Sequence, residues 1–155
     1  GLAPDTDLKE GLTKYLAESR VKIELQGRGG PRGGGEQVKS AEELAAVFKA
    51  GAFMDLIRVR SDGTAENGHV LAQRIMSGGA PIEAETKLEN GRWVVTLKRP
   101  LMSDKPGDIA IEPGKLYTVG FAIHDDFTNA RFHHVSLDLR LGLDMPEAEI
   151  NVKKR

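Results

Sequence analysis

From residue 51 onward the sequence repeats one pattern, and this repetition limits the possible folds more than any other feature. A short apolar or β-branched run is followed each time by glycine, proline, asparagine or aspartate, which favour tight reversals of the chain. The expected strands span residues 53–60, 82–88, 92–99, 116–124 and 131–141. Short strands without intervening helices predict a mainly β fold, an antiparallel β-sandwich of the immunoglobulin-like two-sheet kind.

The dipeptide Asn90-Gly91 separates two of these strands. Asn-Gly favours a type I′ turn, because both central residues of that turn need positive φ angles. Residues 82–88 and 92–99 are therefore expected to form a β-hairpin.

A short helix is expected just before the strands, over residues 41–50. Ser40 followed by Glu43 is a capping-box signature, in which each residue satisfies a backbone N–H of the other. The apolar face of this helix consists of Leu44, Val47 and Phe48. Further upstream, residues 7–19 show helical spacing weakened by a glycine, and residues 27–35 hold six glycines and a proline, which predicts a loop.

Composition limits the class of protein. A chain of 155 residues is long enough to bury the core of one domain, so a second domain is not expected. The chain carries 22 Lys and Arg against 23 Asp and Glu without a long like-charge block, so nucleic-acid binding is not expected. No apolar run approaches the ~20 residues that cross a bilayer, so no transmembrane segment is expected. The first residues lack both Met and a signal-peptide pattern, which suggests a trimmed chain.

The last expected strand, 131–141, carries a histidine on its apolar face. Alternate residues place Arg131, His133, Val135, Leu137, Leu139 and Leu141 on one side and Phe132, His134, Ser136, Asp138 and Arg140 on the other. His133 is thus expected to point inward, where an imidazole either has a buried hydrogen-bond partner or is a ligand to a group held in the core. His134 is expected to be solvated.

Two other kinds of site are weakly supported by the sequence. His124, Asp125 and Asp126 are adjacent, but consecutive side chains on an extended chain diverge, so a strand-end turn is favoured over a divalent-metal site. No serine has the surroundings of a hydrolase nucleophile, and the chain has no cysteine.

Six segments resemble the haem-binding domain of the ethylbenzene-dehydrogenase type, a domain similar to the γ subunits of DMSO-reductase-family enzymes. They are Gly-Ala-Phe-Met-Asp-Leu at 51–56, Arg-Ile-Met-Ser-Gly-Gly at 74–79, Gly-Arg-Trp-Val-Val-Thr-Leu-Lys-Arg-Pro-Leu at 91–101, Phe-Ala-Ile-His-Asp-Asp at 121–126, Arg-Phe-His-His-Val-Ser-Leu at 131–137 and Leu-Gly-Leu-Asp at 141–144. The version associated with multihaem c-type cytochromes of the NapC/NirT kind is the most similar. The resemblance covers residues 39–144, expected to be the core of a single domain over 1–155, with 1–38 as a peripheral segment and 145–155 as a tail.

The resemblance implies a cofactor and a function. Domains of this family are β-sandwiches that hold one b-type haem. Because the chain has no cysteine for a covalent c-type attachment, haem b would be bound non-covalently. The implied role is electron transfer in a periplasmic respiratory chain, not catalysis, with a multihaem c-type cytochrome or a periplasmic oxidoreductase as the redox partner.

The resemblance also implies the axial ligands of the iron. The family uses a methionine and a lysine, and matching Val135-Ser136 to the family's Val-Ser pair puts the position of the lysine at His133. The family's methionine precedes a glycine-rich turn and a proline-containing strand, as Met76 does here. Met76 and His133 are therefore the expected ligands, with Met54 as the alternative methionine and His124 next.

Three cations flank the matched segments and are candidates to bind the haem propionates, although solvated strand edges explain them equally well: Arg74, Lys98 and Arg99. Two readings without a working haem site also stay open. One is a carbohydrate-module-like sandwich, disfavoured because Trp93 is the single tryptophan. The other is a structural domain whose haem site has degenerated. A visible spectrum would separate the three.

Overall fold

The computed structural model describes residues 16–21, 37–124 and 133–153. By contacts within the chain, the described residues fall into two compact units, one within residues 14–110 and the other within 111–155. The prediction of a single domain over 1–155 stays a prediction.

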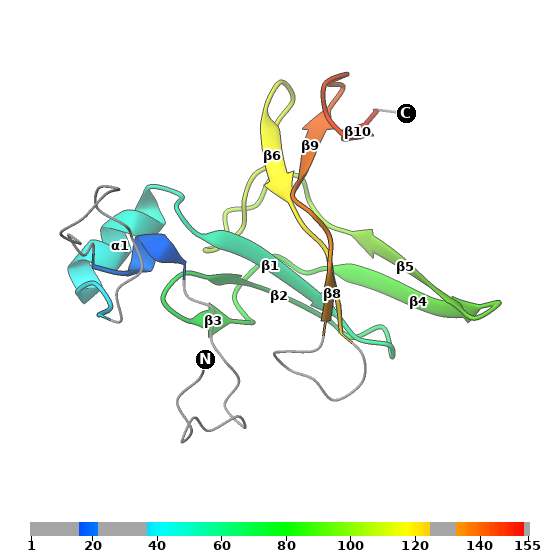
Figure 1. The fold of residues 1–155 in the computed structure, drawn as a ribbon, viewed down its shortest axis with the longest axis horizontal. Helices are drawn as coiled ribbons and strands as arrows, with labels where there is room; N and C mark the ends of the chain where they lie inside the picture. Colours follow the sequence, from blue (N-terminus) through cyan, green and yellow to red (C-terminus); the bar gives the residue numbers. More distant parts are fainter. Residues whose placement is uncertain (1–15, 22–36, 125–132, 154–155) are drawn as a thin grey trace, which may run out of the picture. The chain divides into compact units, whose positions relative to one another are not determined.

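The 14–110 unit contains a helix, a three-stranded sheet and a hairpin (Figure 1). A short 3-10 helix, Ala17–Ser19, precedes helix α1, Ala41–Lys49. Strands β1, Met54–Val59, β2, Ala65–Val70, and β3, Arg74–Ile75, form an antiparallel sheet in the order β1-β2-β3. Strands β4, Glu83–Glu89, and β5, Arg92–Lys98, form a separate antiparallel hairpin. Buried apolar side chains of this unit are Val70, Leu71 and Ala80.

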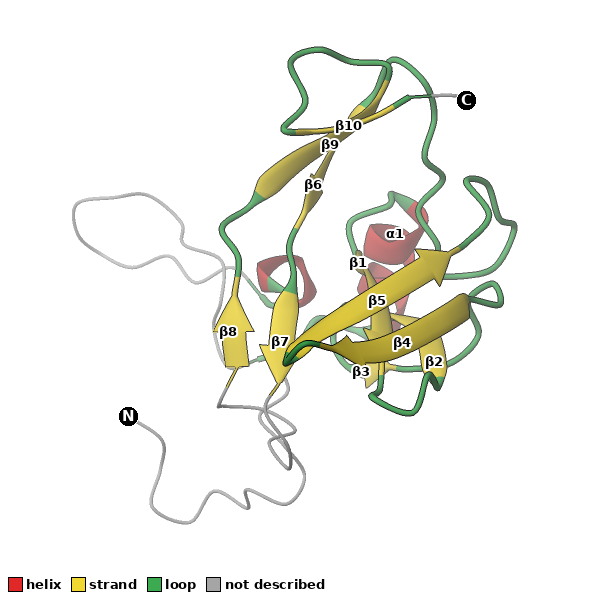
Figure 2. Ribbon diagram, turned by 90° about the vertical axis from the view of Figure 1, so that its right-hand side faces the viewer, coloured by secondary structure: helices red, strands yellow, loops and turns green. Residues whose placement is uncertain are grey.

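The 111–155 unit contains two small sheets (Figure 2). Strands β6, Leu116–Val119, β9, Leu139–Leu143, and β10, Ile150–Val152, lie in the order β10-β9-β6, with β10 parallel to β9. Strands β7, Ala122–His124, and β8, His133–Val135, form an antiparallel pair. The described chain is thus mainly β with mostly antiparallel sheets, which confirms the predicted fold class.

Local sequence signals are confirmed where they specify a helix cap or a turn. Ser40 Oγ accepts a hydrogen bond from the Glu43 N–H at 3.3 Å, and Glu43 Oε2 accepts one from the Ser40 N–H at 2.9 Å, which completes the capping box. Between β4 and β5, Asn90 and Gly91 have φ angles of 51° and 75°, as a type I′ turn requires.

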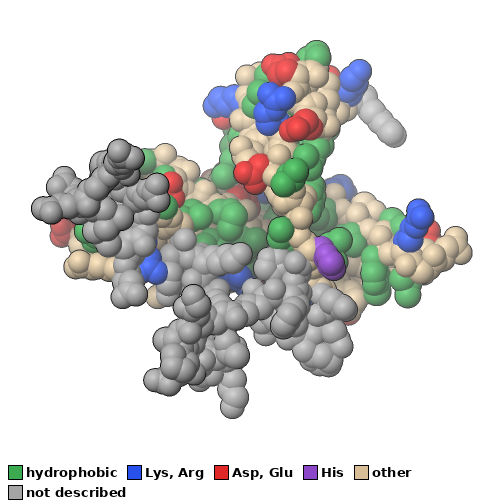
Figure 3. All heavy atoms as spheres, in the orientation of Figure 1, with side chains coloured by type: hydrophobic (Ala, Val, Ile, Leu, Met, Phe, Trp, Pro, Cys, Tyr) green, Lys and Arg blue, Asp and Glu red, His purple; other side chains and the backbone are tan. Residues whose placement is uncertain are grey.

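The β4–β5 hairpin has two chemically different faces. Leu88 lies opposite Trp93, and both are more than half exposed, at 60% and 56%. Hydrophobic side chains therefore reach the surface along this hairpin (Figure 3). The other face carries the exposed Lys98–Glu83 ion pair at 2.9 Å.

The predicted continuous strands 116–124 and 131–141 are wrong, because each is two shorter strands. At the interruption the Ser136 N–H donates to the Phe121 carbonyl at 2.9 Å, and the Phe121 N–H donates to Ser136 Oγ at 2.9 Å. The Ser136 hydroxyl thus takes the place of a backbone acceptor. The alternation of side chains between the two faces of the strand therefore does not continue past Ser136. The expected buried aliphatic face is wrong as well, since Val135 is 64% and Leu137 86% exposed.

Three strands escaped prediction: β2, β3 and β10. Strand β2 contains Asn67-Gly68, a dipeptide that favours turns, and few strongly apolar residues. Strand β3 has two residues and exists because it pairs with β2. The expected glycine-rich loop 27–35 and most of the expected helical segment 7–19 lie outside the described residues. Within the described ranges, no helix is long and apolar enough to cross a membrane.

Candidate functional site

Met76 begins a loop over residues 76–80, here called the Met76 loop, directly after β3. Ile75 of β3 pairs with His69 of β2, so the loop starts at the edge of the three-stranded sheet. The Met76 side chain is half-buried. Gly78 has a φ of 92°, which residues with a side chain rarely adopt, so the reversal in this loop depends on glycine.

Two glycines allow the Met76 loop and β2 to approach each other closely. A Cβ on Gly68 would overlap the Ile75 carbonyl oxygen and would lie 2.8 Å from the Met76 Cα. A Cβ on Gly79 would lie 2.5 Å from the Asn67 side chain and 2.7 Å from Asp108 Oδ1. A larger residue at Gly68 would push the loop away from the sheet, and a larger residue at Gly79 would displace the side chains of Asn67 and Asp108.

The carboxyl end of the Met76 loop is held by two polar side chains, here called the Asn67–Asp108 clamp. Asn67 Nδ2 donates to the Ala80 carbonyl at 2.9 Å and to Asp108 Oδ1 at 2.8 Å. The Ala80 N–H donates to Asp108 Oδ2 at 2.9 Å, and the Gly79 N–H donates to the Asn67 carbonyl at 3.3 Å. Asn67 is buried, with 7% of its surface exposed. Both N–H donors of its amide are therefore used inside the protein.

The Asp108 carboxylate is stabilised in its charged form. Burial raises the pKa of Asp108, but hydrogen bonds from Ser103, the Ala80 N–H and Asn67, together with the Arg99 charge, outweigh burial. The net effect holds the pKa of Asp108 below its usual range. At neutral pH both of its oxygens therefore accept hydrogen bonds within the clamp.

Acid should weaken the clamp. A carboxyl whose pKa is lower in the folded than in the unfolded state stabilises the fold above its unfolded pKa, about 3.9, and that contribution is lost as the pH falls through the folded value. Asp108→Asn should therefore unfold at a lower urea concentration than the parent protein at pH 7, and the difference should shrink at pH 3. A difference that stays constant between the two pH values would contradict this assignment.

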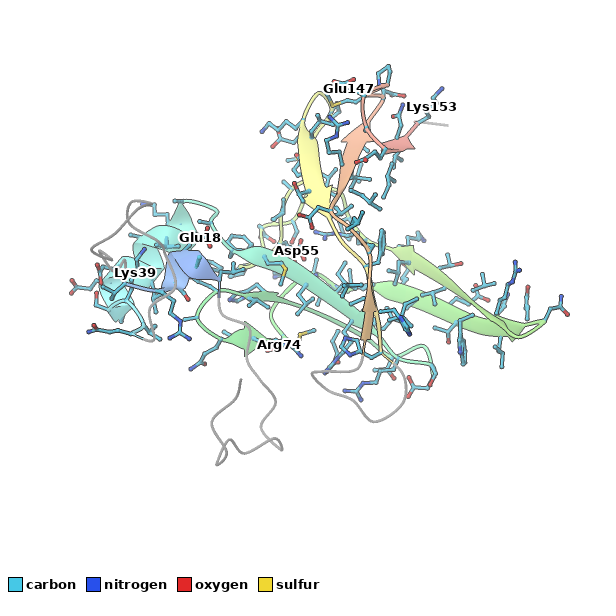
Figure 4. The ribbon with its side chains drawn as sticks, viewed as in Figure 1. Glu18, Lys39, Asp55, Arg74, Glu147 and Lys153 are labelled. Atoms are coloured by element: carbon cyan, nitrogen blue, oxygen red, sulfur yellow. The ribbon has the colours of Figure 1, made fainter. Side chains whose placement is uncertain are left out.

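A second carboxylate fixes the segment that carries Asp108. Asp55 of β1 (Figure 4) accepts hydrogen bonds at Oδ2 from Arg99 Nη1 at 2.8 Å and from the Ile109 N–H at 2.9 Å. The Arg99 and Asp55 side chains are only 17% and 10% exposed. Arg99 is thus engaged in a partly buried ion pair, which makes it a poor candidate for binding a propionate. Of the other two cations, Arg74 lies exposed on β3 and Lys98 pairs with Glu83 at the surface.

His69 is a half-buried histidine that the sequence reasoning missed. Its ring centroid lies 4.9 Å from that of Phe48 and 6.1 Å from that of Phe53, and its buried Nδ1 has no hydrogen-bond partner among the described residues. Asp55 lies directly opposite His69 in the β1–β2 ladder, and Asn67 lies on the same face. The sequence signal that could have identified His69 was its spacing of two residues from Asn67, which is typical of one face of a strand. The Asn67-Gly68 dipeptide favours a turn and so argued against a strand here.

His69 also lines a pocket of about 330 Å³ within the 14–110 unit. Its walls are formed by Val38, Leu44, Phe48, His69, Leu71, Ala72, Gln73 and Ile75. The lining is mainly apolar, and it includes Ile75, the residue that precedes Met76.

The alternative methionine, Met54, also belongs to the 14–110 unit. It opens β1 opposite Val70 and is 43% exposed. The next residue, Asp55, accepts hydrogen bonds from Arg99 and from the Ile109 N–H, so the backbone at Met54 is held as well. The two methionines therefore differ in exposure and in the element that carries them, a strand for Met54 and a loop for Met76.

The remaining predicted site residues lie in the 111–155 unit. His133 of β8 is paired with His124 of β7, and His134, which is exposed, is paired with Ile123. The side chain of His133 and the residues Asp125 and Asp126 lie outside the described part. Met76 and His133 fall in different units, so their pairing as ligands stays a prediction. Within the described ranges, no three His, Cys, Asp or Glu side chains are grouped to hold a metal ion.

Comparison with known proteins gives a family and one relative. The family described as ethylbenzene dehydrogenase matches residues 17–136, which begins upstream of the expected core and ends before residue 144. Cytochrome c-552 of Stutzerimonas stutzeri is 36% identical over 142 residues, an alignment that covers 84% of this chain and 48% of the relative. The chain thus spans about half the length of this relative. No solved structure matches the chain. Because the family match extends over most of the sequence and agrees with the resemblance of its motifs, this chain belongs to the ethylbenzene dehydrogenase family.

Proposed function

We propose that this domain binds one haem non-covalently and transfers electrons without catalysing a reaction. The observation that carries the proposal is the family match over residues 17–136, together with a relative that is a cytochrome. The absence of cysteine in this chain supports non-covalent binding of a b-type haem.

The donor groups in the chain fit such a cofactor. Met76 offers a half-buried thioether on a loop whose two ends are fixed to β2, and thioether and imidazole are common axial ligands of haem iron. We propose Met76 and His133 as the ligands. A haem with both axial positions filled by protein side chains passes single electrons. The protein's part is to hold the thioether in place.

A periplasmic location and a c-type cytochrome or periplasmic oxidoreductase as the redox partner belong to the same proposal. They are supported by the family resemblance and by a relative that is itself a c-type cytochrome about twice as long as the stretch it shares with this chain. The NapC/NirT type of multihaem cytochrome is the partner we propose to test first. Electron transfer between the two purified proteins, followed by stopped-flow spectroscopy, would measure it.

Haem stoichiometry is the test of the proposed function. The chain expressed with haem available should bind about one haem per polypeptide, and acid–acetone should extract all of it, because no cysteine is present to form a thioether bond. The pyridine haemochrome spectrum and mass spectrometry of the extracted protein would measure both quantities. Colourless protein after reconstitution would overturn the proposal, and haem that stays on the polypeptide would overturn its non-covalent part.

The two adjacent histidines of β8 provide an internal comparison. Consecutive positions of a strand face opposite sides, and the ladder pairs His133 with His124 but His134 with Ile123. His133→Ala should lose low-spin haem, whereas His134→Ala should keep it, as measured by the Soret and α/β bands at equal protein concentration. The reverse pattern would move the ligand to the other face of β8.

A further inference from the structure

A methionine ligand needs a fixed backbone, because its own side chain is flexible. Methionine has several rotatable bonds and adapts to irregular surroundings, so the side chain alone does not fix the position of its sulfur. Met76 follows a strand of only two residues, and the β2–β3 ladder consists of the pairs His69–Ile75 and Val70–Arg74. This ladder fixes the amino end of the Met76 loop and leaves its carboxyl end to other contacts.

The Asn67–Asp108 clamp fixes that carboxyl end. Asn67 and Asp108 together hold both the N–H and the carbonyl of Ala80, and the Asn67 carbonyl holds the Gly79 N–H. Gly79 has no room for a side chain between the two clamp residues. Only residues 76–78 lie between the fixed ends. The path of the backbone at Met76 is therefore set from both sides.

The segment that carries Asp108 is itself held by further hydrogen bonds. Asp108 precedes Ile109, whose N–H and carbonyl are bonded to Asp55 and Arg99 respectively, at 2.9 and 3.3 Å. The Asp55–Arg99 pair thus ties this segment to β1, the strand next to β2. A displacement of the Met76 loop would therefore break hydrogen bonds both to Asn67 of β2 and to Asp108.

Asn67 is an unfavourable residue to bury for stability alone. Its Oδ1 is buried without a hydrogen-bond partner among the described residues, and a buried polar atom without a partner opposes folding. The two hydrogen bonds donated by Nδ2 offset this cost, and both serve the loop or the residue that holds it. Both hydrogen bonds that the Asn67 side chain donates therefore help to hold the Met76 loop.

We propose that Asn67 and Asp108 are positioning residues that set the placement of the Met76 thioether toward the haem iron and so maintain the reduction potential. The proposal rests on the proposed haem-binding function and on Met76 as a ligand. Neither residue is assigned contact with the haem. They act through the backbone of Gly79 and Ala80.

The test uses two single variants and the exchanged pair. Asn67→Asp removes the amide donors and places a second carboxylate beside Asp108, and Asp108→Asn replaces one of the two acceptor oxygens by a donor. The double variant Asn67→Asp/Asp108→Asn restores an amide beside a carboxylate and an acceptor for the Ala80 N–H, but it leaves the Ala80 carbonyl without its side-chain donor. Ser40→Ala is the control, because it removes a side-chain hydrogen bond at the N-terminus of α1, in the same unit but outside the clamp and the β2–β3 ladder.

Hydrogen exchange of the haem-free protein measures the clamp by itself. In both single variants the Gly79 and Ala80 amides should exchange at least about tenfold faster than in the parent chain, while the amides of the β1–β2 ladder change little, since exchange reports local opening. The exchanged pair should recover part of the protection of the Ala80 amide, because the side chain at 108 again offers an acceptor for it.

The absorption spectra and reduction potentials of the haem-loaded proteins test whether the clamp positions Met76. Both single variants should lose part of the red-edge absorption band of a methionine ligand and show a lower potential, in the direction of Met76→Ala. The exchanged pair should recover part of both, and Ser40→Ala should retain both despite the lower stability that follows from the loss of a helix cap.

The single variants could keep the absorption band and the reduction potential of the parent protein although their Gly79 and Ala80 amides exchange faster. That result would overturn the positioning role. If Met76→Ala changes the band and potential but the clamp variants do not, only this inference fails. If Met76→Ala changes neither, the ligand assignment fails and the positioning role fails with it, while haem stoichiometry still decides the proposed function.

Discussion

Replacing Met76 by alanine should erase the weak absorption band at the red edge of the visible spectrum that accompanies a thioether ligand of ferric haem. It should also lower the reduction potential, because methionine favours the ferrous state. A loss of at least about 60 mV is expected, since that corresponds to a tenfold change in a one-electron equilibrium. Absorption spectroscopy and a redox titration of the same preparation would measure both effects.

Met54→Ala is the matched control for this substitution. Met54 lies on β1 of the same unit and is 43% exposed, so its truncation should cost less than the ~2–5 kcal/mol typical of a buried methionine. The band and the potential should be unchanged. If they survive Met76→Ala and vanish with Met54→Ala, the ligand is Met54. If both variants keep them, another residue is the ligand, and His124 is the next to replace.

Replacing Gly68 by alanine should destabilise the 14–110 unit by about 3 kcal/mol, because overpacking of a filled site costs roughly 1–3 kcal/mol and occasionally more. The added Cβ would overlap the Ile75 carbonyl oxygen and would lie 2.8 Å from the Met76 Cα, and backbone atoms cannot move aside as a flexible side chain can. Urea unfolding would give the change in the free energy of unfolding. In the haem-loaded protein the same variant should weaken the methionine band, because the Met76 loop is displaced.

Gly91→Ala separates steric overlap from backbone strain. Gly91 has a φ of 75°, but a Cβ added there would meet no atom within 4 Å, so its replacement should cost only about 1–2 kcal/mol of conformational strain. Gly68 has no such strained φ, and its cost arises from overlap with β3. Equal losses for the two variants would show that the close approach of β2 and β3 is not what makes Gly68 necessary.

Sequence patterns predicted those elements that depend on neighbouring residues. The Ser40–Glu43 capping box and the Asn90-Gly91 turn each form through contacts between residues a few positions apart, and the structure has both. The absence of cysteine excludes a c-type thioether bond between haem and this stretch of chain, whatever the fold. The family motifs named Met76 and His133 as ligands, an assignment that stays a prediction.

Only the tertiary structure decided what surrounds Met76. Asn67 and Asp108 are 41 positions apart, and Asp55 and Arg99 are 44 apart, so no local pattern links them. Strand β2 was missed because Asn67-Gly68 favours a turn in isolation, whereas here pairing with β1 and β3 outweighs that preference. The interruption at Ser136 likewise depends on Phe121, a residue of another strand segment. Local propensity determines which short segments form readily, and the hydrogen bonds between distant segments determine where a ligand loop is held.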